Sequence, residues 1–255
     1  MRPTDVDKLG WDFDRGLSWY AVPSDNAAEV ANFLLVDSQP IGVADGVARV
    51  NGQTDPAPDW VYVLPSFDGW VVVVVPNPLR ALTEFHPPLQ FLSEHFGQAC
   101  YFVGDKGSDR YCWGRGERGV VERVVLSRDT LFEDEFGAYT DTENELYQEC
   151  LEEDEEHGLG YCREYAEVID IDFVAFLAGK WSVNPVTLLL QENAHDGQGY
   201  WGTTDVDMLF PLSPPERPSG GGPQVTHQIV TPRAVDQPVP RSWRSRVADW
   251  LTRRG

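Results

Sequence analysis

Two glycine patterns in the sequence have the spacing of a dinucleotide-binding loop. Gly114-Arg-Gly-Glu-Arg-Gly119 and Gly197-Gln-Gly-Tyr-Trp-Gly202 both match G-x-G-x-x-G. In such a loop, glycines let the backbone approach a pyrophosphate at the N-terminus of a helix that follows a strand. The first pattern lies between two expected antiparallel strands, and the second leads into Thr203 and Thr204 with no helix to follow. We therefore expect turns at both places and no nucleotide cofactor.

Residues that could bind metal are present, but their spacing does not match a known metal site. A calcium loop that began at Asp5 would place Leu9 at its fifth position and Gly16 where a bidentate carboxylate is needed. The five histidines never occur four residues apart, and the four cysteines form no C-x-x-C pair. There is also no G-x-S-x-G nucleophile elbow. We expect no metal, no cofactor and no identifiable catalytic residue.

The cysteines are Cys100, Cys112, Cys150 and Cys162. We expect reduced, buried thiols that behave as small apolar side chains. Cys100 and Cys112 fall on consecutive expected strands, where they could face one another. The N-terminal residues lack the apolar stretch of a secretory signal, and no apolar run is long enough to span a membrane. The expected location is the cytoplasm.

The strongest pattern is one of charge. The formal net charge is −21, and residues 129 to 172 hold 17 Asp and Glu against one basic residue, Arg163. Such a surface repels nucleic acid and anionic lipid and favours a cationic protein. Repulsion within an isolated acidic helix is unfavourable, so the segment is either a solvated helix face, a surface for a basic partner, or a divalent-cation site. The candidate partner-binding residues are Glu145, Glu149, Glu152, Glu153, Asp154, Glu155 and Glu156.

The C-terminal part of the chain has a different composition. Eight of the 19 prolines lie between Pro211 and Pro240, so we expect one acidic domain over residues 1–212 and a flexible linker over 213–240. Residues 241–255 predict a basic amphipathic helix. It would form only when docked on the domain, on a partner or, less favourably, on anionic lipid, and the alternative is a tail that stays disordered. Its docking residues are Trp243, Val247, Trp250 and Leu251, with Arg244 and Arg246 beside them.

The expected fold is α+β, with a mainly antiparallel central sheet and helices packed on it. Strands are predicted at 17–22, 40–50, 60–64, 69–75, 99–103, 110–113 and 120–126. Five consecutive valines, Val71 to Val75, predict a strand that is covered on both faces. Helices are predicted after Asn26, within 78–96 and over 142–156, the last opened by a Thr142/Glu145 capping box. A further helix would carry the stripe Ile169, Phe173, Leu177 and Trp181.

Three short motifs resemble a scattered family of uncharacterised bacterial proteins. They are Trp11-Asp-Phe with Gly16, Leu64-Pro-Ser-Phe-Asp-Gly-Trp70, and Trp181-Ser-Val-Asn-Pro185 with Leu188. The resemblance covers residues 11–202 and implies a bacterial origin and one continuous domain, without implying an activity.

Three functions remain in competition. The first is an acidic inhibitor or immunity-type protein that masks a basic partner, such as a nuclease toxin. It would use surface aromatic residues as anchors, drawn from Trp60, Trp70, Trp113, Tyr139, Tyr147 and Tyr161. The second is an adaptor that works through its C-terminal basic helix. The third is a small enzyme on an unfamiliar scaffold.

Overall fold

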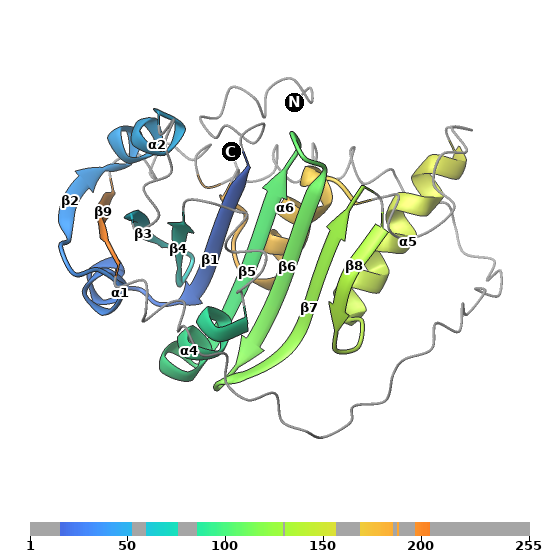
Figure 1. Ribbon diagram of the computed structural model, residues 1–255, viewed down its shortest axis with the longest axis horizontal. Coiled ribbons are helices and arrows are strands. Elements are labelled where there is room, and N and C mark those ends of the chain that lie inside the picture. Colours follow the sequence, from blue (N-terminus) through green and yellow to red (C-terminus); the bar gives the residue numbers. More distant parts are fainter. Residues whose placement is uncertain are drawn as a thin grey trace.

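The computed structural model describes residues 16–52, 60–75, 86–129, 131–156, 169–185, 188 and 197–204. Within these residues, nine strands form one sheet in the order β2-β9-β3-β4-β1-β5-β6-β7-β8 (Figure 1). Each neighbouring pair of strands is antiparallel. The expected α+β class with an antiparallel sheet is confirmed. The predicted linker at 213–240 and tail helix at 241–255 lie outside the described residues.

Strands and helices are mixed along the chain, and the four strands from β5 to β8 follow one another without a helix between them. The strands are β1 (Leu17–Pro23), β2 (Gln39–Gly42), β3 (Trp60–Phe67), β4 (Trp70–Val75), β5 (Gln98–Asp105), β6 (Arg110–Glu117), β7 (Val120–Arg128), β8 (Leu131–Phe136) and β9 (Gln198–Thr203). The helices are α1 (Ala27–Leu34), α2 (Val43–Gly52), α4 (His86–Phe96), α5 (Asp141–Glu156) and α6 (Ile171–Trp181).

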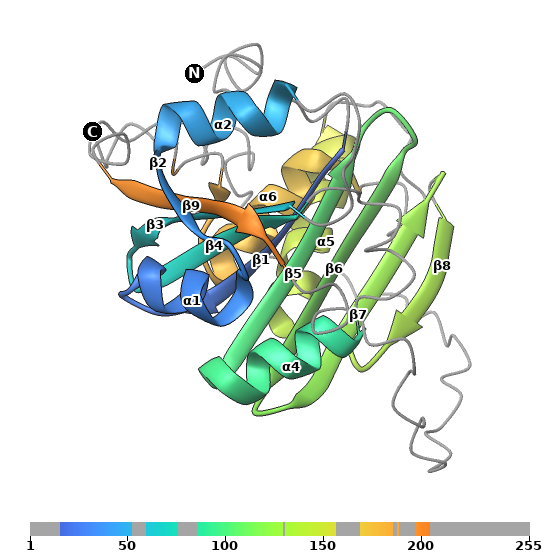
Figure 2. The same cartoon turned by 60° about the vertical axis from the view of Figure 1, so that its left-hand side comes forward.

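The sheet separates two apolar layers. Helices α2, α5 and α6 cover one face of the sheet, and α1 and α4 cover the other (Figures 1 and 2). Their apolar side chains form one cluster with the strands on each face. Strand β4 contributes to both layers: Val72 and Val74 belong to the first, and Val71, Val73 and Val75 to the second. The sequence prediction for the valine strand is confirmed.

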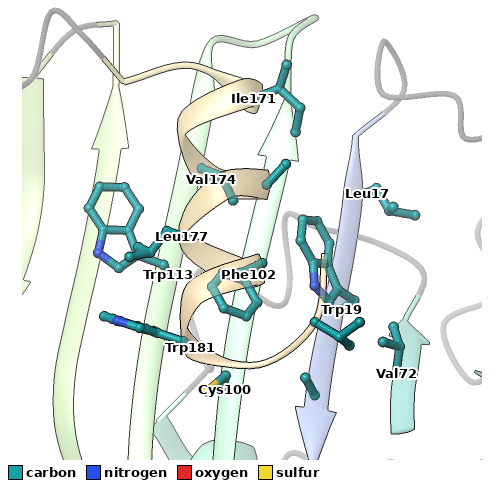
Figure 3. Packing of buried hydrophobic residues seen from close by; sticks show 14 of the residues in the cluster. Leu17, Trp19, Val72, Cys100, Phe102, Trp113, Ile171, Val174, Leu177 and Trp181 are labelled. Atoms are coloured by element: carbon teal, nitrogen blue, oxygen red, sulfur yellow. The ribbon is translucent and has the colours of Figure 1, made fainter. Parts of the chain in front are cut away.

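Helix α6 makes the closest cover of the first face. Its residues Leu177 and Trp181 lie over Phe102 of β5 and Trp113 of β6, with Trp19 of β1 beside them (Figure 3). All four residues of the predicted stripe are buried, but α6 begins at Ile171, so it carries Phe173, Leu177 and Trp181 while Ile169 precedes it.

Several predicted boundaries are confirmed by local chemistry. The Asn26 side chain accepts hydrogen bonds from the amides of Ala28 and Glu29 at 3.1 and 3.3 Å, so it caps α1 as expected. Asp68 and Gly69 both have positive φ angles, 48° and 79°, as the two-residue turn between β3 and β4 requires.

Three assignments were wrong or missing. Residues 40–50, predicted as a strand, form the short strand β2 and then helix α2. Strands β8 and β9 were not predicted at all. We expected turns at both glycine patterns, and this was largely wrong: Gly114 and Gly116 lie within strand β6, and only Arg118 and Gly119 form the turn. The pattern at 197–202 forms most of strand β9. The glycines at 114 and 116 serve packing. A Cβ at Gly114 would lie 3.1 Å from Leu89, and one at Gly116 would lie 3.1 Å from Ser93, so both let α4 approach the sheet.

The cysteine expectation is partly corrected. Cys100 and Cys112 are both buried, but Cys100 belongs to the layer beneath α6 and Cys112 to the layer on the opposite face. The two thiols therefore cannot face one another. Burial raises the pKa of the Cys100 thiol to about 12, which makes it a poor nucleophile at neutral pH.

We predict that Val73→Asp prevents folding. Val73 is 1% exposed in the second layer, so the variant would bury an unpaired carboxylate at a cost of several kcal/mol. The matched control is Val36→Asp, because Val36 is 69% exposed. Circular dichroism and thermal melting should show a folded control and an unfolded Val73 variant. If the Val73→Asp protein unfolds cooperatively at an unchanged melting temperature, β4 is not covered by apolar layers on both faces.

Candidate protein-binding surface

One end of the sheet is built around a buried arginine. Arg123 lies on β7, next to the edge strand β8, and only 1% of it is exposed. Its main partner is Glu143 in the first turn of α5, which is 0% exposed. The Arg123 Nε donates to the two Glu143 carboxylate oxygens at 2.9 and 3.2 Å. This contact fixes the start of α5 against the sheet.

The other nitrogens of Arg123 reach β8 and the loop that follows it. Nη2 donates to Glu135 at 2.7 Å, while Nη1 donates to the carbonyls of Phe136 and Gly137 at 3.3 and 2.9 Å. The guanidinium also lies over the Tyr139 ring, 4.5 Å from its centroid. Every nitrogen of this buried cation therefore has a partner, as a buried charge requires.

The opposite charges of this cluster stabilise each other in the ionised form. Burial acts to lower the pKa of Arg123, but Glu143 and Glu135 outweigh it and the pKa lies above its ordinary value. Glu143 also accepts a hydrogen bond from the Trp113 indole at 2.7 Å. Burial, together with Glu135, raises the pKa of the Tyr139 hydroxyl, so Tyr139 stays neutral at physiological pH. The cluster is therefore a network of ion pairs, in which the guanidinium of Arg123 binds the carboxylates of Glu135 and Glu143.

The capping box of α5 lies two residues before the predicted one. The Thr140 hydroxyl accepts from the Glu143 amide at 3.1 Å, and the Glu143 carboxylate accepts from the Thr140 amide at 2.8 Å. The predicted Thr142/Glu145 pair matches the same pattern but is not used. Gly137 makes the approach to this cap possible, because its φ is +81° and a Cβ there would collide with the Glu122 carbonyl oxygen.

Around this cluster the surface is acidic. Residues 131 to 152 include eight Asp and Glu and no Lys or Arg. Three of the carboxylates are held by arginines: Glu135 and Glu143 by Arg123, and Glu133 by Arg128 at 2.9 Å. We call the remaining five the acidic edge. It consists of Asp134 on β8 and of Asp141, Glu145, Glu149 and Glu152 on α5.

The structure places part of the predicted site. Glu145 and Glu152 are exposed on α5, and Glu149 is half-buried on the same helix. The backbone of residues 153–156 continues that helix, whereas their side chains lie outside the described residues, as do the tail residues from Trp243 to Leu251. Sequence analysis missed Asp134 and Asp141. The lack of any basic residue between 131 and 152 would have identified both.

Three of the six predicted aromatic anchors are wrong. Trp60, Trp113 and Tyr147 are buried in the core, and Trp70 and Tyr139 are partly buried, so the side chains expected at the surface stabilise the sheet instead. Tyr161 lies outside the described residues. The large apolar side chains exposed in the described part are Val36, Val120, Leu131 and Phe136. Leu131 and Phe136 lie on β8 itself, at 64% and 51% exposure.

Other kinds of site were sought in the same residues. Among the described residues, no three His, Cys, Asp or Glu side chains lie together in a way that could hold a metal ion. No helix in the described segments is both long and apolar enough to cross a membrane. Comparison of the chain with protein-family models, with curated proteins and with solved structures found no match.

We predict that Arg123→Met destabilises the protein by about 3–5 kcal/mol, because it leaves the Glu143 carboxylate buried and unpaired. Arg115→Met is the matched control. Arg115 pairs directly with Arg123 across β6 and β7, but its ion pair with Glu122 at 3.2 Å is partly exposed. The control should cost about 0–1 kcal/mol. Urea denaturation measures both; equal costs would contradict a special role for the buried pair.

Proposed function

We propose that this chain is an acidic protein-binding protein that masks a basic surface of its partner, in the manner of an inhibitor or immunity protein. One observation carries the proposal: the acidic edge collects carboxylates on β8 and α5, and no salt bridge within the described residues holds Asp134, Asp141, Glu145 or Glu152. A protein tolerates uncompensated like charges of this kind at some cost to its stability.

A basic enzyme that acts on nucleic acid would suit this surface. The active site of such an enzyme must be cationic to hold phosphates, so an acidic protein can occupy it and exclude the substrate. Electrostatic complementarity would accelerate encounter and reject other partners. A nuclease toxin is therefore the partner class that we propose, with a cytoplasmic location in which the buried Cys100 and Cys112 thiols stay reduced.

The acidic edge has a firm support. The Arg123–Glu143 pair and the Thr140 cap hold the first turn of α5, so Glu145, Glu149 and Glu152 are presented on an ordered helix. A rigid presentation lowers the entropic cost of binding relative to a flexible acidic segment. This distinguishes the proposed role from that of a solvating charged tail.

The test is affinity capture from a bacterial lysate with three versions of the full chain. The first is the wild type, and the second carries Glu145→Gln, Glu149→Gln and Glu152→Gln. The third carries Glu29→Gln, Asp37→Asn and Asp45→Asn, which remove the same charge from exposed positions near the other end of the sheet. We expect the wild type and the third version to capture a basic protein and inhibit its activity, and the second to lose it.

Kinetics with the captured protein give a sharper prediction. Neutralising Glu145, Glu149 and Glu152 should slow association about tenfold at low salt and change dissociation much less. The urea midpoint of this triple variant should equal or exceed that of the wild type, because repulsion between carboxylates along α5 is relieved. Capture that survives neutralisation but is lost on removal of residues 213–255 would support the adaptor function instead. Equal capture by all versions would refute a role for the acidic edge.

A further inference from the structure

We propose that β8 is the docking strand of the acidic edge, and that it accepts an extended, basic segment of the partner as an added antiparallel or parallel strand. This inference rests on the proposed function and names its mode of binding. Among the described residues, the sheet order ends at β8, with β7 on one side only. A strand at the end of a sheet presents alternate N–H and C=O groups outward, ready for pairing.

The side chains of β8 protect this edge only in part. Natural edge strands are shielded by charges, by prolines or by bulges, and β8 has both acidic residues and a register shift near Glu133. Yet Leu131 and Phe136 remain 64% and 51% exposed. Their partners on β7 are Arg128 and Val124, and Val124 belongs to the layer beneath α1 and α4. Exposed apolar residues at such an edge favour contact with another chain.

Register defines what an added strand would meet. Leu131, Asp134 and Phe136 pair with Arg128, Leu126 and Val124, so all three point to the face of the sheet on which α4 lies. Glu135 pairs with Val125 and points to the opposite face, where α5 packs and carries Glu145, Glu149 and Glu152. An added strand with basic residues among apolar ones would meet carboxylates on both faces and apolar contacts at Leu131 and Phe136.

Charge selects the occupant. A second copy of β8 would bring Glu133, Asp134 and Glu135 against the same residues of its partner, and like charges on adjacent strands destabilise pairing. A cationic segment reverses the sign of those contacts. The occupant that the edge favours is therefore a partner segment rich in Lys or Arg that alternates with apolar residues.

The experiment uses the full chain and a synthetic peptide of about eight residues, alternately Lys and Val, the length of an ordinary strand. The control peptide has the same sequence with alternate backbone amides N-methylated, which preserves charge but removes hydrogen-bond donors. We expect the first peptide to bind at low ionic strength and to slow hydrogen exchange of β8 amides. N-methylation should weaken binding about tenfold or more, because several backbone hydrogen bonds are lost.

Two variants place the contact. Leu131→Ser should weaken binding of the unmethylated peptide by about threefold to tenfold through lost apolar contact. Val36→Ser is the matched control and should leave binding unchanged, because Val36 is 69% exposed outside β8 and the acidic edge. Both variants should melt near the wild-type temperature, since each removes an exposed side chain.

Failure of this inference differs from failure of the proposed function. Equal binding of both peptides with unchanged β8 exchange would overturn strand pairing. In that case the acidic edge would remain the docking surface if the peptides bound more weakly to the variant with Glu145→Gln, Glu149→Gln and Glu152→Gln than to the wild type. A peptide that binds equally to wild type and triple Gln variant would count against both proposals. The β8 amides could also exchange slowly before any peptide is added, and exchange faster once residues 213–255 are removed. That result would show that the chain's own tail occupies the edge, and it would overturn the proposed partner strand.

Discussion

The arrangement of the acidic end depends on the ion pair between Arg123 and Glu143. The pair is fully buried, so both charges have left water, and only complete hydrogen bonding offsets that loss. Arg123 bonds to two carboxylates and two carbonyls, and Glu143 bonds in addition to the Trp113 indole and the Thr140 amide. The cluster therefore connects β6, β7, β8 and α5. Its directional hydrogen bonds fix the relative positions of these elements more specifically than apolar contacts alone would.

This cluster also explains how a strongly acidic segment folds at all. Two of its eight carboxylates are paired to one buried cation, and a third is paired to Arg128. The fully buried pair of Arg123 and Glu143 is therefore neutral, and the second carboxylate on Arg123, that of Glu135, is partly exposed. The remaining charges are displaced outward onto β8 and the solvent side of α5. Their mutual repulsion is then screened by water and salt. A stable internal anchor thus permits a surface with one sign of charge, which is the property that the proposed binding function uses.

Sequence patterns predicted the centre of the fold better than its edges. The valine run of β4 and the four-residue stripe of α6 are repeated signals that packing on both sides of the sheet reinforces. Strand β8 has three acidic residues, Glu133 to Glu135, in its middle. Because it lies at the edge of the sheet, few of its side chains must be apolar, so its composition resembles that of a loop. The segment 40–50 was misread even though Val43, Val47 and Val50 have helical spacing, a signal that was available.

The candidate site was predictable in kind but not in detail. Charge density marked the α5 helix, whereas nothing local distinguishes Thr140/Glu143 from Thr142/Glu145, because both match the same capping pattern. Arg123 makes the choice from 20 positions away in the chain, and a buried arginine cannot be recognised from composition.

The most direct measurement of the central claim is hydrogen exchange of the full chain in complex with the basic protein that it captures. The account predicts slowed exchange in β8 and α5, with α1 and α2 unchanged near the other end of the sheet. Slowed exchange confined to α1, α2 or the residues beyond 213, with β8 and α5 unaffected, would contradict it.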